Sequence, residues 1–153
     1  MNRRVLAYIV FGICSFLWLG FRHPTLAQAA APTYAIPNPP NERLKDFSII
    51  EDQGTWHAFA MSVCVSAPCN RPYSIIWHYV SRDLHTWTNL GIALAPRPGT
   101  IDAGDVWAPT VVGNSGQWTM FYTAVQYQGN AAIQRIAVAT STDLLSWDRQ
   151  TNN

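Results

Sequence analysis

The chain has 153 residues, of which 48% are hydrophobic and 12% are charged; this balance is typical of one globular domain and excludes a disordered chain. The formal net charge of +1 excludes a partner held by a strongly basic surface, so we expect no nucleic-acid partner. Seven Trp, six Tyr and six Phe favour a β-rich fold or a surface that faces carbohydrate, and composition leaves both open.

Residues 1–29 predict a signal peptide. Arg3 and Arg4 precede an apolar run from Val5 to Gly20, and Ala27-Gln28-Ala29 matches an A-x-A cleavage site. An uncleaved membrane anchor is the alternative, although the run is short for a span of about 20 residues. We therefore expect export to the periplasm, the medium or the secretory lumen, with any membrane contact made only through this segment.

Export gives the cysteines a simple interpretation. Cys14 lies in the expected signal peptide, which leaves Cys64 and Cys69 in an oxidising compartment. They flank a short loop, so we expect a disulfide that rigidifies it, with free thiols as the alternative. We expect no metal or other cofactor, because no second Cys or His pair lies at zinc-ligand spacing.

A linker and a first set of strands follow. Residues 30–44 are rich in Pro and Asn, which disfavours helices and strands, and predict an extended linker. Residues 45–94 then form a first unit with a turn at 52–55. Its four strands are expected at residues 47–51, 56–65, 73–81 and 88–94.

The same order repeats after a second linker, residues 95–104. Strands are expected at 106–112, 117–125 and 133–141, with a turn at 113–116, and polar residues stand where a fourth strand should follow. The second unit therefore occupies residues 105–153. Two motifs recur at offsets of 62 and 60 residues: Gly54-x-Trp56-x-x-Phe59 as Gly116-x-Trp118-x-x-Phe121, and Ser81-x-Asp83-Leu84-x-x-Trp87 as Ser141-x-Asp143-Leu144-x-x-Trp147.

Two four-stranded antiparallel units with a period near 60 residues indicate an all-β chain made of β-propeller blades. Propellers close with four or more blades, and two blades leave exposed faces and edges. We therefore expect either a truncated piece of a longer propeller or a chain that self-associates through its unpaired blade faces.

The repeated residues have structural interpretations. Asp83 and Asp143 are expected to accept hydrogen bonds from nearby backbone N–H groups, with the Leu and Trp of each motif packed between sheets. Trp56 and Trp118 are expected to pack in the core or between blades. The remaining histidines are scattered over two strands and a loop, which does not favour a metal site: His57, His78 and His85.

One carboxylate stands apart. Glu42 is assigned to the linker, whereas Asp46 stands directly before the first strand of the first unit. The first strand of a propeller blade lines the central axis, so its entry opens on the axial pocket. Asp46 is therefore a candidate general base, with a turn cap as the alternative.

Lys45 to about Asp148 resembles the five-bladed propeller glycoside hydrolases, a superfamily that includes arabinanases, β-xylosidases, invertases and levansucrases. The likeness is closest to glycoside hydrolase family 43. It rests on the Lys45–Ile50 segment before the first Gly-x-Trp-x-x-Phe motif, on Trp107-Ala108-Pro109 with the later Met120–Thr123 segment, and on the Ser-x-Asp-Leu-x-x-Trp turn.

The resemblance implies carboxylate chemistry on a glycosidic bond, with Asp46 as general base. Family members carry an Asp directly after Trp-Ala-Pro, where this chain has Thr110, so that role is vacant or taken by Asp105. Asp105, Trp107 and Thr110 are the expected sugar contacts at the pocket rim. The general acid would be a Glu of a third blade, so the chain alone is expected to be inactive.

The sequence therefore predicts an exported glycoside hydrolase whose substrate is a plant-type or storage carbohydrate: an arabinoside, a xyloside or a fructoside. The alternative is a non-catalytic, secreted carbohydrate-binding or assembly module built from propeller blades. Sialidase-like chemistry is a third possibility, but it would need an arginine cluster that the scattered arginines do not supply.

Overall fold

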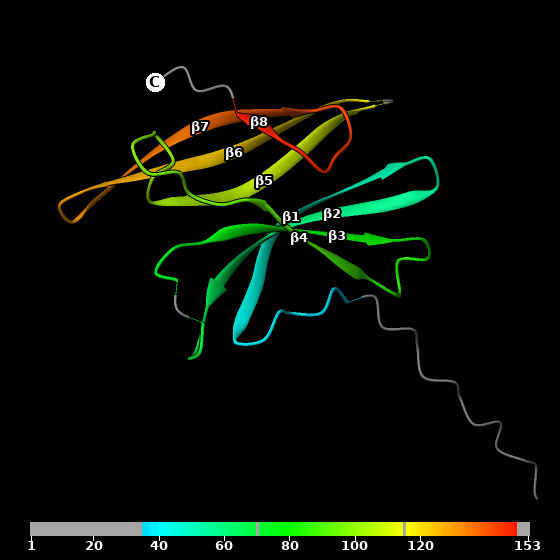
Figure 1. Ribbon diagram of the computed structural model, residues 1–153, viewed down its shortest axis with the longest axis horizontal. Helices are drawn as coiled ribbons and strands as arrows, with labels where there is room; N and C mark the ends of the chain where they lie inside the picture. The colour runs from blue at the N-terminus through cyan, green and yellow to red at the C-terminus, as the bar shows by residue number, and fades with distance from the viewer. Residues whose placement is uncertain (1–34, 70, 115, 150–153) are drawn as a thin grey trace, which may run out of the picture. The chain divides into compact units, whose positions relative to one another are not determined.

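The computed structural model describes residues 35–69, 71–114 and 116–149, which form two four-stranded antiparallel sheets (Figure 1). Each sheet is a meander in which strands pair in chain order. The first contains β1 (Glu42–Asp52), β2 (Thr55–Cys64), β3 (Ile75–Ser81) and β4 (Thr88–Leu94). The second contains β5 (Asp105–Asn114), β6 (Gln117–Gln128), β7 (Ala131–Ser141) and β8 (Asp148–Arg149). The predicted all-β class is confirmed.

The described residues hold no helix that could cross a membrane. The predicted signal peptide, residues 1–29, lies outside the described part of the chain.

The first strand is longer than the sequence predicts. β1 begins at Glu42 rather than at Phe47, because the segment from Glu42 onward pairs with β2 as far as Cys64. Two residues assigned from sequence to positions outside this strand, Glu42 and Asp46, therefore lie within it. The Pro-rich composition before Glu42 hid this start, since the strand begins two residues after Pro40.

The hairpin between β1 and β2 has the predicted turn. Gln53 and Gly54 occupy its two central positions with φ of 49° and 78°. Positive φ at both central residues matches the right-handed twist of paired strands, and glycine adopts it without steric cost. The turn places Trp56 at the start of β2, where it is half-buried.

The Ser-x-Asp-Leu-x-x-Trp motif forms the predicted turn in both sheets. Asp83 Oδ1 accepts hydrogen bonds from the backbone N–H groups of His85 and Thr86 at 2.8 and 2.7 Å. These bonds lower the pKa of Asp83 to about 2. In the second copy Asp143 Oδ1 accepts from the N–H groups of Leu145 and Ser146, both at 2.8 Å.

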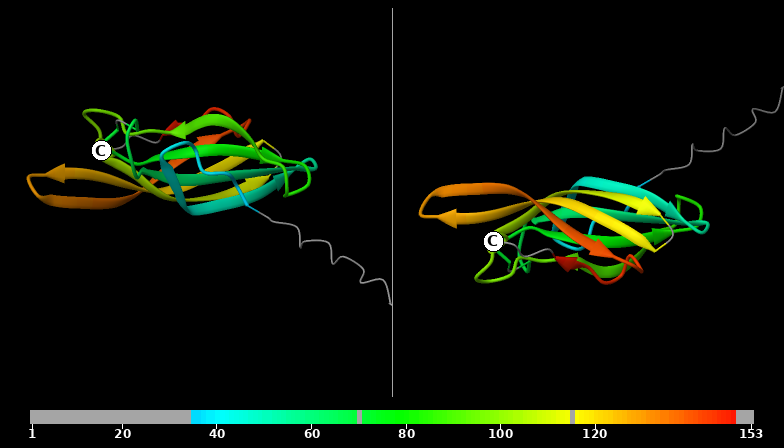
Figure 2. Two further views of the ribbon diagram at one scale, coloured as in Figure 1. Left: turned by 90° about the horizontal axis from the view of Figure 1, so that it is seen from below. Right: turned by 90° about the horizontal axis from the view of Figure 1, so that it is seen from above.

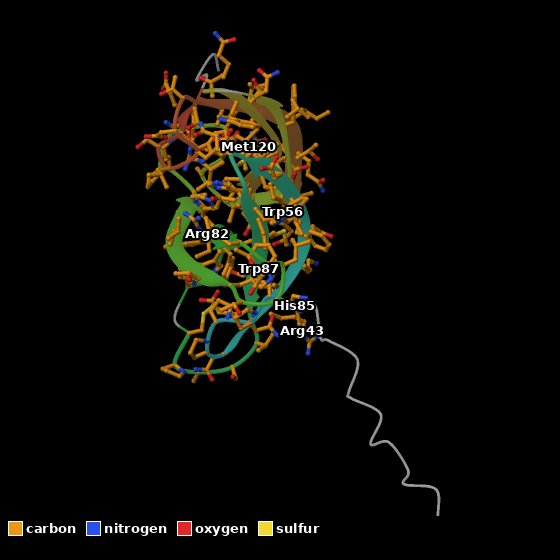
Figure 3. All side chains as sticks on the ribbon, turned by 90° about the vertical axis from the view of Figure 1, so that its right-hand side faces the viewer. Arg43, Trp56, Arg82, His85, Trp87 and Met120 are labelled. Carbon is orange, nitrogen blue, oxygen red and sulfur yellow. A yellow bond between two sulfur atoms is a disulfide. The ribbon has the colours of Figure 1, made fainter. Side chains whose placement is uncertain are left out.

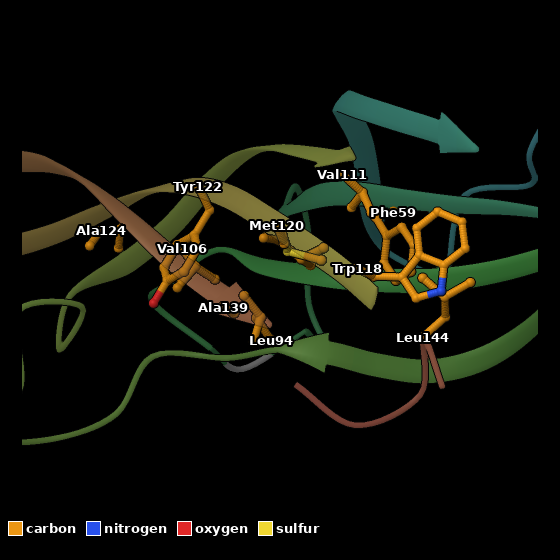
Figure 4. Packing of buried hydrophobic residues seen from close by; sticks show 12 residues of the cluster. Phe59, Leu94, Val106, Val111, Trp118, Met120, Tyr122, Ala124, Ala139 and Leu144 are labelled. Atoms are coloured by element: carbon orange, nitrogen blue, oxygen red, sulfur yellow. The ribbon is translucent and has the colours of Figure 1, made fainter. Parts of the chain in front are cut away.

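The two sheets pack face to face around one hydrophobic core (Figures 1 and 4). Phe59 of the first sheet is fully buried and packs with Trp118 and Met120 of the second. Its ring lies edge-on to Trp147, with centroids 5.3 Å apart. β5 is the strand of the second sheet that lies against β1, β2 and β3. The core position predicted for Trp118 is confirmed.

The outward faces of both sheets remain apolar. Phe47 is 65% exposed on the first sheet, whereas Phe121 and Ile136 are 42% and 81% exposed on the second. Figure 2 shows the sheets from below and from above. Figure 3 labels Trp56 of β2, Trp87 of the turn before β4, and Met120 of the second sheet. The exposed faces match the expectation for two blades without further neighbours.

Candidate active site

Each sheet has a bulge in its innermost strand, and the two bulges are equivalent. The β1–β2 register shifts between Lys45 and Phe47, which leaves Asp46 at φ 43°. The β5–β6 register shifts between Trp107 and Thr110, and Ala108 has φ 46°. Asp46 and Ala108 are 62 residues apart, the offset of the sequence repeat. Bulges of this kind re-aim side chains and are common beside active sites.

Asp46 lies at an open apolar hollow. It lines a cavity of about 530 Å³ together with Phe47, Leu84 and Trp87. Asp46 is exposed, and within the described part of the chain its carboxylate has no hydrogen bond or ion pair. An aspartate tolerates the left-handed backbone better than most residues. The carboxylate is therefore free to meet a ligand.

Asp105 is occupied by protein contacts. It is 4% exposed at the start of β5. Its Oδ1 accepts a hydrogen bond from the backbone N–H of Ser74, and its Oδ2 accepts one from the hydroxyl of Tyr127 at 2.5 Å. The bond to Asp105 raises the pKa of Tyr127. Trp107 uses the same neighbour, because its Nε1–H donates to Ser74 Oγ at 3.1 Å.

The structure therefore joins two of the predicted sugar contacts, Asp105 and Trp107, through Ser74. Thr110 is exposed on β5. The cavity that Asp46 lines includes none of these three residues. Within the two described sheets, Asp46 therefore lines a different cavity surface from the predicted sugar contacts Asp105, Trp107 and Thr110.

Glu42 is a partly buried carboxylate that the sequence analysis assigned to the linker. Its Oε2 accepts hydrogen bonds from Ser62 Oγ and Trp77 Nε1, both at 2.7 Å, and pairs with Arg71 Nη2 at 2.5 Å. Burial alone would raise the pKa of Glu42, but these hydrogen bonds and the Arg71 charge together lower it. The residue was hidden because its partners lie on β2, β3 and their loop, far along the chain.

Arg71 and a disulfide order the loop between β2 and β3. Cys64 and Cys69 are joined with Cα atoms 5.7 Å apart. Arg71 donates to Tyr73 O at 2.6 Å and to Ser62 Oγ at 2.7 Å. The loop is thus tied to its own strands and to Glu42.

Asp102, in the connection between the sheets, is fully buried and forms an ion pair with Arg149. It accepts hydrogen bonds from Tyr122 Oη at 2.8 Å, from Arg149 Nη1 at 2.7 Å and from Thr100 Oγ1. These partners lower the pKa of Asp102 despite its burial. Both oxygens are engaged in the fold, so Asp102 is not available to a substrate.

Two histidines meet where the sheets pack. His57 Nδ1 and His78 Nε2 lie 2.9 Å apart and share a hydrogen bond. His78 is 3% exposed and stacks on Phe59 with ring centroids 4.4 Å apart. Burial, with a smaller contribution from the charge of His57, lowers the pKa of His78 to about 4. No group of three or more metal-ligating side chains gathers among the described residues.

A larger hollow, of about 860 Å³, lies by the turn between β5 and β6. Its wall includes Trp118, Thr140 and one carboxylate, Asp148. It lies at the hairpin end of the second sheet rather than at the bulges, so size alone does not mark the site.

The sequence model described as "Glycosyl hydrolases family 32 N-terminal domain" matches residues 38–153. No curated protein sequence matches the chain.

Solved structures resemble the fold. Fructan 1-exohydrolase IIa from Cichorium intybus superposes with a TM-score of 0.62 at 23% identity, covering 76% of this chain and 22% of that enzyme. Sucrose-6-phosphate hydrolase from Lactobacillus gasseri superposes with a TM-score of 0.56 at 20% identity, covering 69% of this chain and 22% of that enzyme. An endo-arabinase from Bacteroides thetaiotaomicron VPI-5482 superposes with a TM-score of 0.55 at 20% identity, covering 80% of this chain and 37% of that enzyme. The chain thus spans about a fifth of the first relative.

The predicted five-bladed propeller superfamily is confirmed, and the chain covers about two of its blades. The closer likeness to family 43 is not confirmed, although a thermostable family-43 glycoside hydrolase is among the similar structures. The match over residues 38–153 shows that the chain belongs to glycosyl hydrolase family 32, as part of its N-terminal propeller domain.

Proposed function

We propose that the chain forms two blades of an exported glycoside hydrolase that cleaves fructosides, with Asp46 as a catalytic carboxylate. The family assignment supports the reaction class. The names of two similar structures, a fructan exohydrolase and a sucrose-6-phosphate hydrolase, favour fructosides over arabinosides or xylosides. The disulfide supports export, since such bonds persist in oxidising compartments.

One observation carries the proposal. Glu42 and Asp105 lie near the starts of β1 and β5, and the protein uses the carboxylates of both for hydrogen bonds or ion pairs. Asp46 is exposed at a bulge, lines a cavity and makes no such contact within the described residues. A carboxylate with free acceptor sites can meet an anomeric carbon or the water that attacks it.

Hydrolysis breaks the bond between the anomeric carbon and the glycosidic oxygen, and water supplies the new hydroxyl. Asp46 would either take a proton from the attacking water or attack the anomeric carbon and form a glycosyl ester that water then cleaves. A second carboxylic acid must protonate the departing oxygen. We assign that acid to a part of the protein beyond these two blades.

The test is an assay for fructose release from sucrose and from an inulin-type oligosaccharide, made with the complete gene product that contains this chain. We expect Asp46→Asn to lower kcat about a thousandfold, because the amide can neither take a proton nor attack carbon. We expect residues 1–153 alone to release none.

Glu51→Gln is the matched control. Glu51 is exposed on the same strand and accepts a hydrogen bond from Gly54 N, which glutamine preserves. Its kcat should stay within about twofold of the wild type. An Asp46→Asn variant with wild-type kcat would overturn the role of Asp46, and a complete protein inactive on both sugars would overturn the proposed substrate class.

A non-catalytic carbohydrate-binding module is the second candidate, and one observation favours it. The bulge of the second sheet carries Ala108, and Thr110 stands where family 43 has an aspartate, so this bulge adds no carboxylate to match Asp46. Calorimetric binding of a fructo-oligosaccharide without any fructose release would support the module over the enzyme.

A further inference from the structure

The loop between β2 and β3 connects the starts of both innermost strands. At one end, Val65 N donates to Asn41 O at 3.0 Å, and Ser66 Oγ donates to Asn41 Oδ1 at 3.1 Å, directly before β1. At the other end, Ser74 donates its N–H to Asp105 and accepts from Trp107, at the start of β5. The loop therefore spans the boundary between the two sheets.

Both attachments lie close to the bulges. Asn41 is five residues before Asp46, and Asp105 is three residues before Ala108. Further along, the innermost strands touch directly, because Val111 N donates to Ser48 Oγ at 3.0 Å. The spacing between the bulges is thus set by the packing of β5 against the first sheet, which includes this hydrogen bond, and by the loop.

Asp105 is built to hold this loop rather than to bind a sugar. It is 4% exposed, and each of its oxygens already accepts a hydrogen bond. A sugar hydroxyl could reach it only by displacing Ser74 or Tyr127. A carboxylate accepting from a backbone N–H forms a strong, charge-assisted bond, which suits a permanent fastening.

We propose that Asp105 is a positioning residue, which fixes the β2–β3 loop across the two sheets and so holds Asp46 in register with the rim residues of the second sheet. The inference rests on the proposed hydrolysis at Asp46. It assigns Asp105 a role that differs from the sugar contact expected from sequence, and the two roles predict different kinetics.

The first measurement tests the hydrogen bond between Ser74 and Asp105 and does not depend on enzymatic activity. Hydrogen exchange of the peptide around Ser74 is followed in the wild type, in Asp105→Ala and in Tyr127→Phe. Asp105→Ala removes the acceptor of the Ser74 N–H, so its exchange should accelerate about tenfold or more. Tyr127→Phe removes only the bond within the second sheet and is the matched control, with exchange near the wild-type rate.

The second measurement is the split between kcat and KM on the fructoside, in the complete protein. Loss of positioning lowers kcat about tenfold or more with KM within about twofold, because Asp46 itself is intact but misplaced. Loss of a sugar contact would instead raise KM. If Asp105→Ala fails to fold, Ser74→Ala tests the other attachment of the same loop to β5, because it keeps the backbone N–H that donates to Asp105 and removes the acceptor of Trp107 Nε1.

The outcomes separate the two proposals. Faster exchange together with lower kcat supports the positioning role. A raised KM, unchanged exchange, or faster exchange with unchanged kinetics overturns it. If the wild type hydrolyses no fructoside, the proposed function has failed, and the exchange data then decide only whether Asp105 holds the loop.

Discussion

His78 shows how burial makes one residue sensitive to pH. Its folded pKa of about 4 lies below the ordinary value of 6.5, so the unfolded chain binds the proton more readily. Stability is therefore fully present above pH 6.5 and is lost as pH falls towards 4. Because His78 is almost fully buried, we expect urea unfolding at pH 4.5 to give a free energy about 2–3 kcal/mol below that at pH 7.5.

His78→Phe is the check on that expectation, because phenylalanine can keep the stacking on Phe59 but does not titrate. Its loss of stability over the same pH range should be less than half that of the wild type. His57 can contribute the remainder, since burial lowers its pKa as well. An identical pH dependence in the variant would show that other groups cause it.

At the scale of elements, the two copies of the Ser-x-Asp-Leu-x-x-Trp turn share one conformation but differ in what they bury. Leu84 and Leu144 have φ of 63° and 62°. Leu144 is 1% exposed in the core, whereas Leu84 is half-buried at the cavity beside Asp46. We expect Leu144→Ala to lower the free energy of unfolding by about 3 kcal/mol and Leu84→Ala by less than about 1 kcal/mol.

Chemical denaturation of both variants tests this difference. The backbone strain at the two positions is alike, so it cancels in the comparison and leaves only burial. Equal losses of stability would mean that the second sheet does not pack on Leu144 in solution.

At the scale of the whole molecule, equivalent faces of the two sheets differ in how far they are buried. Phe59 and Phe121 occupy the same repeat position, yet Phe59 is fully buried by the second sheet and Phe121 is 42% exposed. Ile136 extends the same outward face, because it pairs with Thr123, two residues from Phe121. An uncovered apolar sheet face favours association. We expect residues 1–153 alone to self-associate as their concentration rises.

Light scattering across a concentration series measures the self-association of residues 1–153. We expect Ile136→Lys, which places a charge on the exposed face, to shift the chain towards monomer. Thr142→Lys adds the same charge at an exposed turn and is the control. A wild-type chain that stays monomeric throughout, or an equal shift in both variants, would contradict the expectation.

Much of the fold was predictable because its signals are local. The turn at Gln53-Gly54, the aspartate-capped turns and the alternating apolar positions of β6 each depend on residues close in the chain. A repeat at a fixed offset then places equivalent elements without any knowledge of their packing. Strand ends were less predictable: only pairing with β2 shows that the first strand begins at Glu42, and β6 and β7 extend three and two residues past their predicted limits.

The candidate site was predictable only in part. Asp46 stood out from sequence because it precedes an apolar, aromatic strand, but nothing local indicates that β1 bulges there. Glu42 and the His57–His78 pair were missed because their partners come from other strands, and strand register decides which side chains meet.

The amino-acid sequence by itself determined the two four-stranded units, their turns and the propeller superfamily to which they belong, because each depends on residues near one another in the chain or at a constant spacing. Only the tertiary structure decided which carboxylates are free. Hydrogen-bond partners brought together from distant strands occupy Glu42, Asp102 and Asp105, whereas a bulge leaves Asp46 exposed.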